Sequence, residues 1–138
     1  MQRFGAFIFL TATATWAADP AGLEFFEKKI RPVLVSECYQ CHSKEEKVKG
    51  GLRLDWKGGW QEGGDSGAAI IPGQVGKSLL IQAIRYSDAE LEMPPKKRLT
   101  AEQVADFEKW VAIGAPDPRM SAEATAKDQQ LNLEAARR

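Results

Sequence analysis

Both cysteines and the only histidine of this 138-residue chain lie within five consecutive positions, in the stretch Cys38-Tyr-Gln-Cys41-His42. Thiol and imidazole groups bind soft metals, form disulfides and carry redox chemistry. Residues i and i+3 lie on one face of a helical turn, so the two sulfurs are expected to point to the same side. Three chemistries use this C-x-x-C spacing.

The first two chemistries fit the surrounding sequence poorly. A dithiol redox pair normally follows a strand in an α/β domain, whereas Cys38 follows a helical pattern. A structural zinc site uses four ligands, so a carboxylate would have to complete the set of Cys38, Cys41 and His42. A plain structural disulfide is a further alternative.

Covalent haem attachment fits better, because it uses the pattern Cys-x-x-Cys-His. Two sulfurs on one helical face can reach the two vinyl groups at one edge of the porphyrin, and the adjacent histidine can bind the iron. We therefore predict one covalently bound haem c per chain, held by Cys38, Cys41 and His42, with His42 as proximal iron ligand.

A second axial ligand is predicted at Met93. The chain has only one histidine, so a second histidine cannot be the ligand. Of the other two methionines, Met1 lies in the leader and Met120 lies in a tail that is expected to be weakly structured. Met93 precedes two prolines, which stiffen the chain and favour an extended conformation before them. The alternatives are an apolar filler role for Met93, a vacant position or another ligand. A His/Met pair raises the reduction potential and closes the iron to small ligands, which favours electron transfer over catalysis.

The first 17 residues have the layout of a signal peptide, although a frayed apolar start of the domain is the alternative. Arg3 supplies a positive charge, residues 4–10 are nearly all apolar, and small residues precede a cut before Ala18. The apolar run is too short to span a bilayer. We expect export to the periplasm or an equivalent oxidising compartment, with no membrane span in the mature chain.

The rest of the chain is expected to form one domain over residues 18–118, followed by a polar, Ala-rich linker or truncated tail over residues 119–138. A hydrophobic fraction of 43% is ordinary for a globular domain. The formal net charge of zero argues against a nucleic-acid binder.

The first predicted helix leads into the haem motif and covers Ala21–Val35, where apolar residues recur at helical spacing. Asp19 and Pro20 are suited to its start. Pro32 is expected to kink the helix, because it lacks an N–H and crowds the carbonyl of Lys28.

Two more helices are predicted beyond a glycine-rich loop. Residues 50–76 hold 9 of the 12 glycines and predict a long loop, with Leu52–Leu54 as a short strand. Ser78–Tyr86 is a short amphipathic helix. The last helix opens at Thr100, which forms a capping box with Gln103, and it ends at Gly114.

Together these features resemble a class I cytochrome c, and most closely the planctomycete-type cytochrome c domain, over roughly Leu23 to Pro118. The segments that carry this resemblance, besides the haem motif, are Phe25–Pro32, Gly50–Asp55, Ile71–Gly73, Lys77–Leu80 and Met93–Pro95.

The resemblance implies an all-α cytochrome c fold of three to four helices around one covalently bound haem, with a glycine-rich loop. The first and last helices would cross, with Phe25 or Phe26 near Trp110. It also implies that Cys38 and Cys41 are thioether sites and that His42 and Met93 are the iron ligands. In many cytochromes c a proline carbonyl soon after the motif orients the proximal histidine. The nearest proline downstream is Pro72, 30 residues on, so a different acceptor is the alternative.

The predicted function is that of an exported monohaem c-type cytochrome domain that carries single electrons and is not itself an enzyme. One alternative is a haem-binding regulatory or accessory module of a larger multidomain exported protein, and another is a metal-binding or disulfide-stapled interaction domain without haem. An unidentified redox protein is the expected partner. Two short runs of basic residues could steer an acidic partner to the haem edge, or they could form an ordinary solvated face. These residues are Lys44, Lys47, Lys49, Lys96, Lys97 and Arg98.

Overall fold

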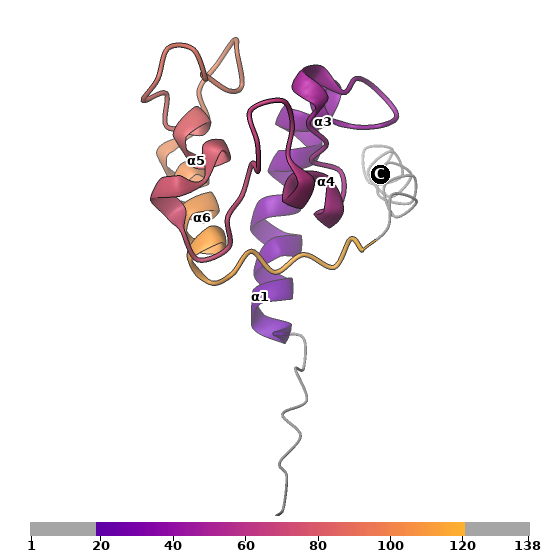
Figure 1. The fold of residues 1–138 in the computed structure, drawn as a ribbon. Coiled ribbons are helices and arrows are strands. Elements are labelled where there is room, and N and C mark those ends of the chain that lie inside the picture. The colour runs from indigo at the N-terminus through magenta and orange to yellow at the C-terminus, as the bar shows by residue number, and fades with distance from the viewer. Residues whose placement is uncertain (1–18, 121–138) are drawn as a thin grey trace, which may run out of the picture.

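A computed structural model describes residues 19–120, and this part of the chain is helical, with isolated bridges in place of strands (Figure 1). The α-helices are α1 (Pro20–Phe25), α2 (Arg31–Val33), α3 (Tyr39–His42), α4 (Lys57–Glu62), α5 (Leu79–Ile84) and α6 (Ala101–Ala112). The all-α prediction is confirmed. The predicted signal peptide, residues 1–17, lies outside the described residues, as does the tail from residue 121.

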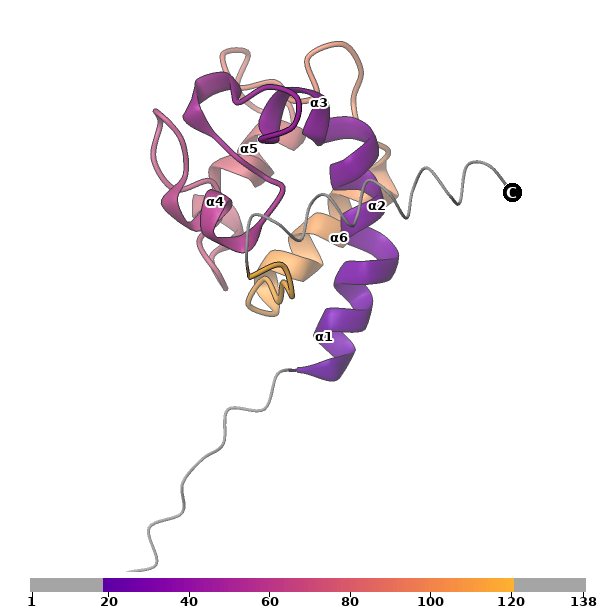
Figure 2. The same ribbon diagram turned by 90° about the vertical axis from the view of Figure 1, so that its right-hand side faces the viewer.

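The first three α-helices form one continuous helical run from Pro20 to His42 (Figures 1 and 2). Two π-helical turns, η1 (Phe26–Ile30) and η2 (Leu34–Cys38), lie on either side of α2. Pro32 occupies the first turn of α2, so the wider turns absorb the disturbance that was expected at this proline, and the helix continues. The run extends seven residues beyond the predicted end at Val35 and carries the whole haem motif.

Helix α6 packs against the N-terminal run through aromatic side chains. The rings of Phe26 and Trp110 are 5.6 Å apart, which confirms the predicted contact between the first and last helices. Trp60 and Phe107 each meet Trp110 nearly edge-on, at 6.0 and 6.1 Å. Such pairs add to the burial of apolar area, so this cluster is the centre of the core.

The glycine-rich segment differs from the prediction in two ways. It contains helix α4, which brings Trp60 into the core, and Leu52–Leu54 forms no strand. The segment around Gly59 passes so close to its neighbour that a Cβ at this position would lie 2.5 Å from the carbonyl oxygen of Arg53. Two short 3₁₀ turns, η3 (Lys49–Gly51) and η4 (Val75–Lys77), complete the segment.

The two C-terminal helices agree with the prediction. Helix α5 lies within the predicted Ser78–Tyr86. Helix α6 begins after Thr100, whose Oγ1 accepts from the Gln103 backbone at 3.1 Å while the Gln103 side chain accepts from the Thr100 backbone at 3.0 Å. Gly114 follows the helix with φ +102°, as expected of a residue that ends a helix.

An extended segment leaves α6 and crosses the N-terminal run (Figure 1). The indole of Trp110 donates to the carbonyl of Pro116 at 2.8 Å. Arg119 is buried, with 1% of its surface exposed, so it packs as part of the domain and not of the tail that was expected to begin there.

Candidate haem site

The haem motif lies at the end of the N-terminal helical run. Cys38 is the last residue of η2, and Cys41 and His42 belong to α3. All three side chains are half-buried, and both cysteines are free thiols. One continuous helical run therefore carries all three residues within five positions.

The imidazole of His42 is oriented by a backbone carbonyl. Its Nδ1 lies 3.2 Å from the oxygen of Leu52. Because a carbonyl oxygen only accepts, this contact places the hydrogen on Nδ1 and leaves the lone pair on Nε2. A histidine that binds a metal through Nε2 commonly has this arrangement, since the second hydrogen bond fixes the ring and raises its basicity. The carbonyl that orients His42 therefore belongs to Leu52 and not to Pro72, the nearest downstream proline.

The backbone after His42 folds back and fixes the residue from both sides. The N–H of Leu54 donates to the His42 carbonyl at 2.8 Å, and His42 forms an isolated bridge with Val48. The hydroxyl of Ser43, which is fully buried, donates to the Tyr39 carbonyl at 2.7 Å. The loop after the motif is therefore tied to the helix that carries it.

A buried carboxylate anchors the same loop. Asp55 is fully buried, and its Oδ2 accepts from the Lys44 backbone at 3.0 Å and from the Arg53 guanidinium at 2.7 Å. The bond from Lys44 spans eleven residues and holds the extended piece that contains Leu52 against the start of the loop. The acceptor for His42 is thus placed by side-chain bonds as well as by the backbone.

Burial governs the Cys38 thiol. The sulfur itself is enclosed although the residue as a whole is half-buried, and this desolvation raises the pKa of the Cys38 thiol to about 12, with Glu37 and Cys41 nearby adding to the effect. Such a thiol stays protonated near neutral pH, whereas redox-active C-x-x-C pairs depend on a thiolate of lowered pKa. This finding weighs against the dithiol alternative.

The loop that carries Met93 lies at the same end of the molecule as α3 (Figures 1 and 2). The Lys97 ammonium reaches the carboxylate of Glu37 at 3.1 Å, which joins this loop to the residue before Cys38. The Met93 backbone donates to the carbonyl of Ala83 at 3.1 Å, while 41% of the residue's surface is exposed. The structure thus brings the Met93 loop beside the haem motif and leaves the role of the thioether as a prediction.

Within residues 19–120 one indole donor is available to a bound group. Trp56 Nε1 is buried and has no hydrogen-bond partner among the described residues. Buried donors are normally satisfied, so this N–H fits an acceptor supplied from outside the polypeptide, such as a haem carboxylate. With two free thiols and an imidazole that presents Nε2, the donor set fits a covalently bound haem.

Comparison with known families addresses the same stretch of chain. Residues 38–97 match the family model Planctomycete cytochrome C. The match begins at the first cysteine, includes His42 and Met93, and covers a little less than half of the chain. It confirms the resemblance to the planctomycete-type cytochrome c domain. A cytochrome c domain indicates haem-based electron transfer, with haem c as the cofactor. No curated protein and no solved structure matches the chain.

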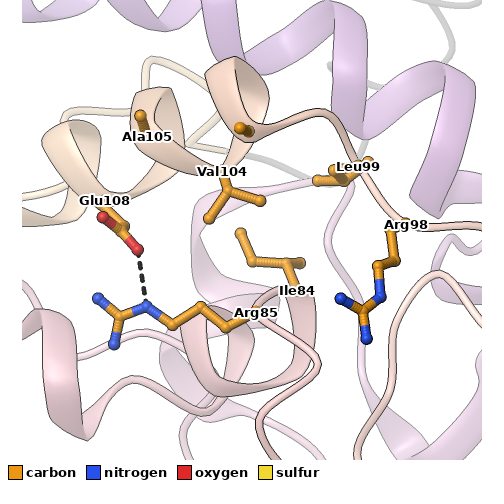
Figure 3. A pocket seen from close by; sticks show the side chains of 8 residues that line it. Ile84, Arg85, Arg98, Leu99, Val104, Ala105 and Glu108 are labelled. Carbon is orange, nitrogen blue, oxygen red and sulfur yellow. Dashed lines mark hydrogen bonds and ion pairs between the residues drawn. The ribbon is translucent and has the colours of Figure 1, made fainter.

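Other features of the described residues lie apart from the cytochrome c motif. A cavity of about 400 Å³ between α5 and α6 contains the ion pair of Arg85 and Glu108, at 2.7 Å, and contacts neither cysteine nor His42 (Figure 3). Within residues 19–120 no group of three or more His, Cys, Asp or Glu side chains is placed to hold a metal ion, which the zinc alternative would require. No helix in this range combines the length and apolarity needed to cross a membrane.

The basic residues expected at the haem edge differ in their surroundings. Lys97 is paired with Glu37, and the guanidinium of Arg98 lies 4.7 Å from the centre of the Tyr86 ring. Both are exposed, and so are the other four, as a steering role requires: Lys44, Lys47, Lys49 and Lys96.

Sequence reasoning gave no site role to Leu52, Asp117 or Arg119. The Leu52 acceptor is a backbone oxygen and leaves no signal in the residue type. Arg119 and Asp117, which bond to each other at 2.6 Å, were assigned to the tail and to the end of the domain without a role. An acidic and a basic residue two positions apart in a polar segment look like surface residues, so the sequence does not indicate that Asp117 and Arg119 are buried.

Proposed function

We propose that this chain is an exported monohaem c-type cytochrome domain that carries single electrons. Cys38 and Cys41 hold the haem covalently, and His42 and Met93 are its axial ligands. The observation that carries the proposal is the bond from His42 Nδ1 to the Leu52 carbonyl, which leaves Nε2 as the free ligand atom in a motif that also holds two free thiols.

The haem iron supplies the change of one electron, and the polypeptide supplies tethering, orientation and shielding. The two thioethers prevent loss of the cofactor in both redox states. The Leu52 carbonyl orients His42, and a Met93 thioether bound to the iron would keep small ligands off it. This ligand pair also raises the reduction potential relative to more strongly donating pairs.

A haem stain tests the attachment. The full chain is expressed in a host with a cytochrome c maturation system and run on a denaturing gel that is stained for haem peroxidase activity. We expect a stained band for the wild type and for Gln40→Ala, an exposed position between the two cysteines. The double variant Cys38→Ser, Cys41→Ser should give no stained band. A wild-type band without haem contradicts the proposal.

Electron transfer and export have separate tests. A potentiometric titration of the haem-loaded protein should follow a single one-electron curve that is reversible, and it should show no hysteresis between reduction and oxidation. Fractionation followed by N-terminal sequencing should find the mature chain outside the cytoplasm, beginning at Ala18. A chain that keeps Met1 and stays in the cytoplasm rejects the export part alone.

A further inference from the structure

The Arg119 side chain is the only guanidinium among the described residues that is fully enclosed, with 1% of its surface exposed. Its Nε and Nη2 donate to the two carboxylate oxygens of Asp117, at 2.9 and 2.6 Å. Its plane lies 4.9 Å from the centre of the Phe26 ring. The carboxylate of Asp117 also accepts from the Trp60 indole at 2.9 Å. A charged pair is therefore built into the core at the end of the domain.

The remaining donor of Arg119 points to the haem motif. Nη1 donates to the Tyr39 hydroxyl at 2.5 Å and to the Leu54 carbonyl at 2.8 Å. Tyr39 lies between the two cysteines, three residues before His42. Leu54 donates its own N–H to the His42 carbonyl at 2.8 Å. One guanidinium nitrogen thus bonds both to the helix that carries the proximal histidine, through Tyr39, and to the extended piece that packs against this histidine, through Leu54.

This arrangement also sets the distance between His42 and its acceptor. Leu52, which accepts from His42 Nδ1, is two residues from Leu54 in the same extended piece. The carbonyl of Arg119 accepts from the Lys57 backbone at 2.9 Å, so the far end of that piece is fixed as well. A shift of Leu54 relative to Tyr39 would lengthen or bend the bond that orients the imidazole.

Stability alone is a weak reason for such a pair. Taking both charges out of water costs several kcal/mol, and well-packed apolar residues commonly replace buried ion pairs with little or no loss. Burial disfavours the charged guanidinium, yet the bonds to Asp117 and Tyr39 outweigh this effect and raise the pKa of Arg119. The cation is retained where a directional donor is needed.

We infer that Arg119 is a positioning residue for His42, acting through Tyr39 and Leu54 on the bond from His42 Nδ1 to the Leu52 carbonyl. The inference rests on the proposed function, because it concerns the iron ligand of the proposed haem. The segment after α6 is then part of the proximal side of the site, although it lies far along the chain from the haem motif.

The test uses the haem-loaded full chain with three variants. Tyr39→Phe removes one hydroxyl, Arg119→Met removes the charge at similar size, and Arg119→Lys keeps the charge without the planar fork. Arg85→Met is the matched control, because it removes an arginine from an ion pair in the cavity away from His42. The readouts are the reduction potential and the solvent exchange of the His42 Nδ1 hydrogen, followed by NMR in the reduced state.

We expect Arg119→Met to raise the potential, because a weaker bond to Leu52 makes the imidazole less basic and favours ferrous iron. The shift should correspond to about a threefold or larger change in the reduction equilibrium constant, below the tenfold or greater effect usual for a direct partner of a ligand. The Nδ1 hydrogen should exchange faster by a similar factor. Tyr39→Phe should act in the same direction to a smaller extent, Arg119→Lys should fall between wild type and Arg119→Met, and Arg85→Met should match wild type.

The inference is overturned if Tyr39→Phe keeps the wild-type potential and the wild-type exchange rate. This variant decides the matter even if Arg119→Met does not fold, because it changes a single hydroxyl. A wild-type chain that carries no haem would instead reject the proposed function, so the two failures are distinguishable.

Discussion

The two sides of the proposed haem site are held in different ways. On the proximal side, His42 ends a helical run of more than twenty residues, and its ring and backbone bond to Leu52 and Leu54. On the distal side, Met93 lies in a loop, 41% exposed. That loop is tied down by the Met93 backbone bond to Ala83, by the bond from the Tyr86 hydroxyl to the Pro94 carbonyl, and by one ion pair, from Lys97 to Glu37, in which the lysine is mostly exposed.

This difference indicates that the two proposed ligands are held with different firmness. The proposed proximal ligand is fixed by a part-buried ring bond to Leu52 with buried bonds behind it, so its contribution to the potential is expected to be set when the domain folds. The proposed distal ligand depends in part on an exposed ion pair, and surface ion pairs contribute at most about 1 kcal/mol. Perturbing the proximal side should therefore affect the whole domain, whereas perturbing the distal side should affect mainly the ligand itself.

The largest effect is expected from breaking the buried pair on the proximal side. Asp117→Ala leaves the Arg119 cation enclosed without its partner and the Trp60 indole without its acceptor. Removing one partner of a buried pair costs about 3–5 kcal/mol. Denaturant unfolding followed by circular dichroism measures the loss. Asp88→Ala, which removes an exposed carboxylate from the distal loop, is the control and should cost less than a third as much. Equal losses would remove the contrast between the two sides.

A smaller effect is expected from crowding the glycine-rich segment. Gly59→Ala places a Cβ 2.5 Å from the Arg53 carbonyl, beside the piece that holds the acceptor of His42. Overpacking of this kind costs about 1–3 kcal/mol. Gly76→Ala is the matched control, because no atom lies within 4 Å of its added Cβ. A thermal unfolding midpoint that drops for Gly76→Ala as much as for Gly59→Ala would contradict the account.

The helix start after the distal loop should matter less. Thr100→Ala removes one half of the capping box of α6. Loss of such a cap costs about 1 kcal/mol. The free energy of unfolding should fall by this amount, and Thr100→Ser, which keeps the hydroxyl, should restore most of it. A cost near that of Asp117→Ala would place more of the stability on the distal side than we infer.

The smallest effect on stability is expected at the distal ion pair. Lys97→Met separates the Met93 loop from Glu37 and should change the free energy of unfolding by less than about 1 kcal/mol. The same variant should bind added imidazole about two- to threefold more tightly, because Met93 is then easier to displace. This factor corresponds to a loss of less than about 1 kcal/mol, since 1.4 kcal/mol would change the affinity tenfold. Absorbance titration measures this affinity, and Lys96→Met is the control. If the two variants bind imidazole equally, the ion pair does not hold the distal loop.

Local patterns in the sequence were sufficient for several elements. The capping box at Thr100 and Gln103 and the terminal Gly114 were predicted correctly, because the residues that make these features lie within one or two helical turns. The contact of Phe26 with Trp110 followed from the family resemblance.

The elements that the sequence did not predict depend on distant contacts. Helix α4 contains Gly58 and Gly59, which disfavour a helix, and it forms where Trp60 packs against Trp110. The N-terminal run continues past Val35 to a buried Tyr39, although the apolar stripe stops earlier. Leu52–Leu54 has the composition of a strand, but its hydrogen-bond partners are His42 and Arg119 and not a second strand.

The four predicted site residues also differ in how far the sequence alone can place them. The cysteines and His42 share one helical run, so their proximity follows from their spacing alone. The position of Met93 depends on how a loop fifty residues away is anchored, which the sequence indicates only through the prolines that follow it.

One measurement tests the central claim, that a single iron is held between a fixed His42 and a replaceable Met93. The oxidised, haem-loaded wild type is scanned for the methionine-to-iron charge-transfer band, alongside Met93→Ala and the control Met120→Ala. The account predicts the band in wild type and in Met120→Ala, and its loss in Met93→Ala while covalent haem and the His42 Nδ1 hydrogen signal remain. A band that persists in Met93→Ala, or a wild type that never shows one, would contradict it.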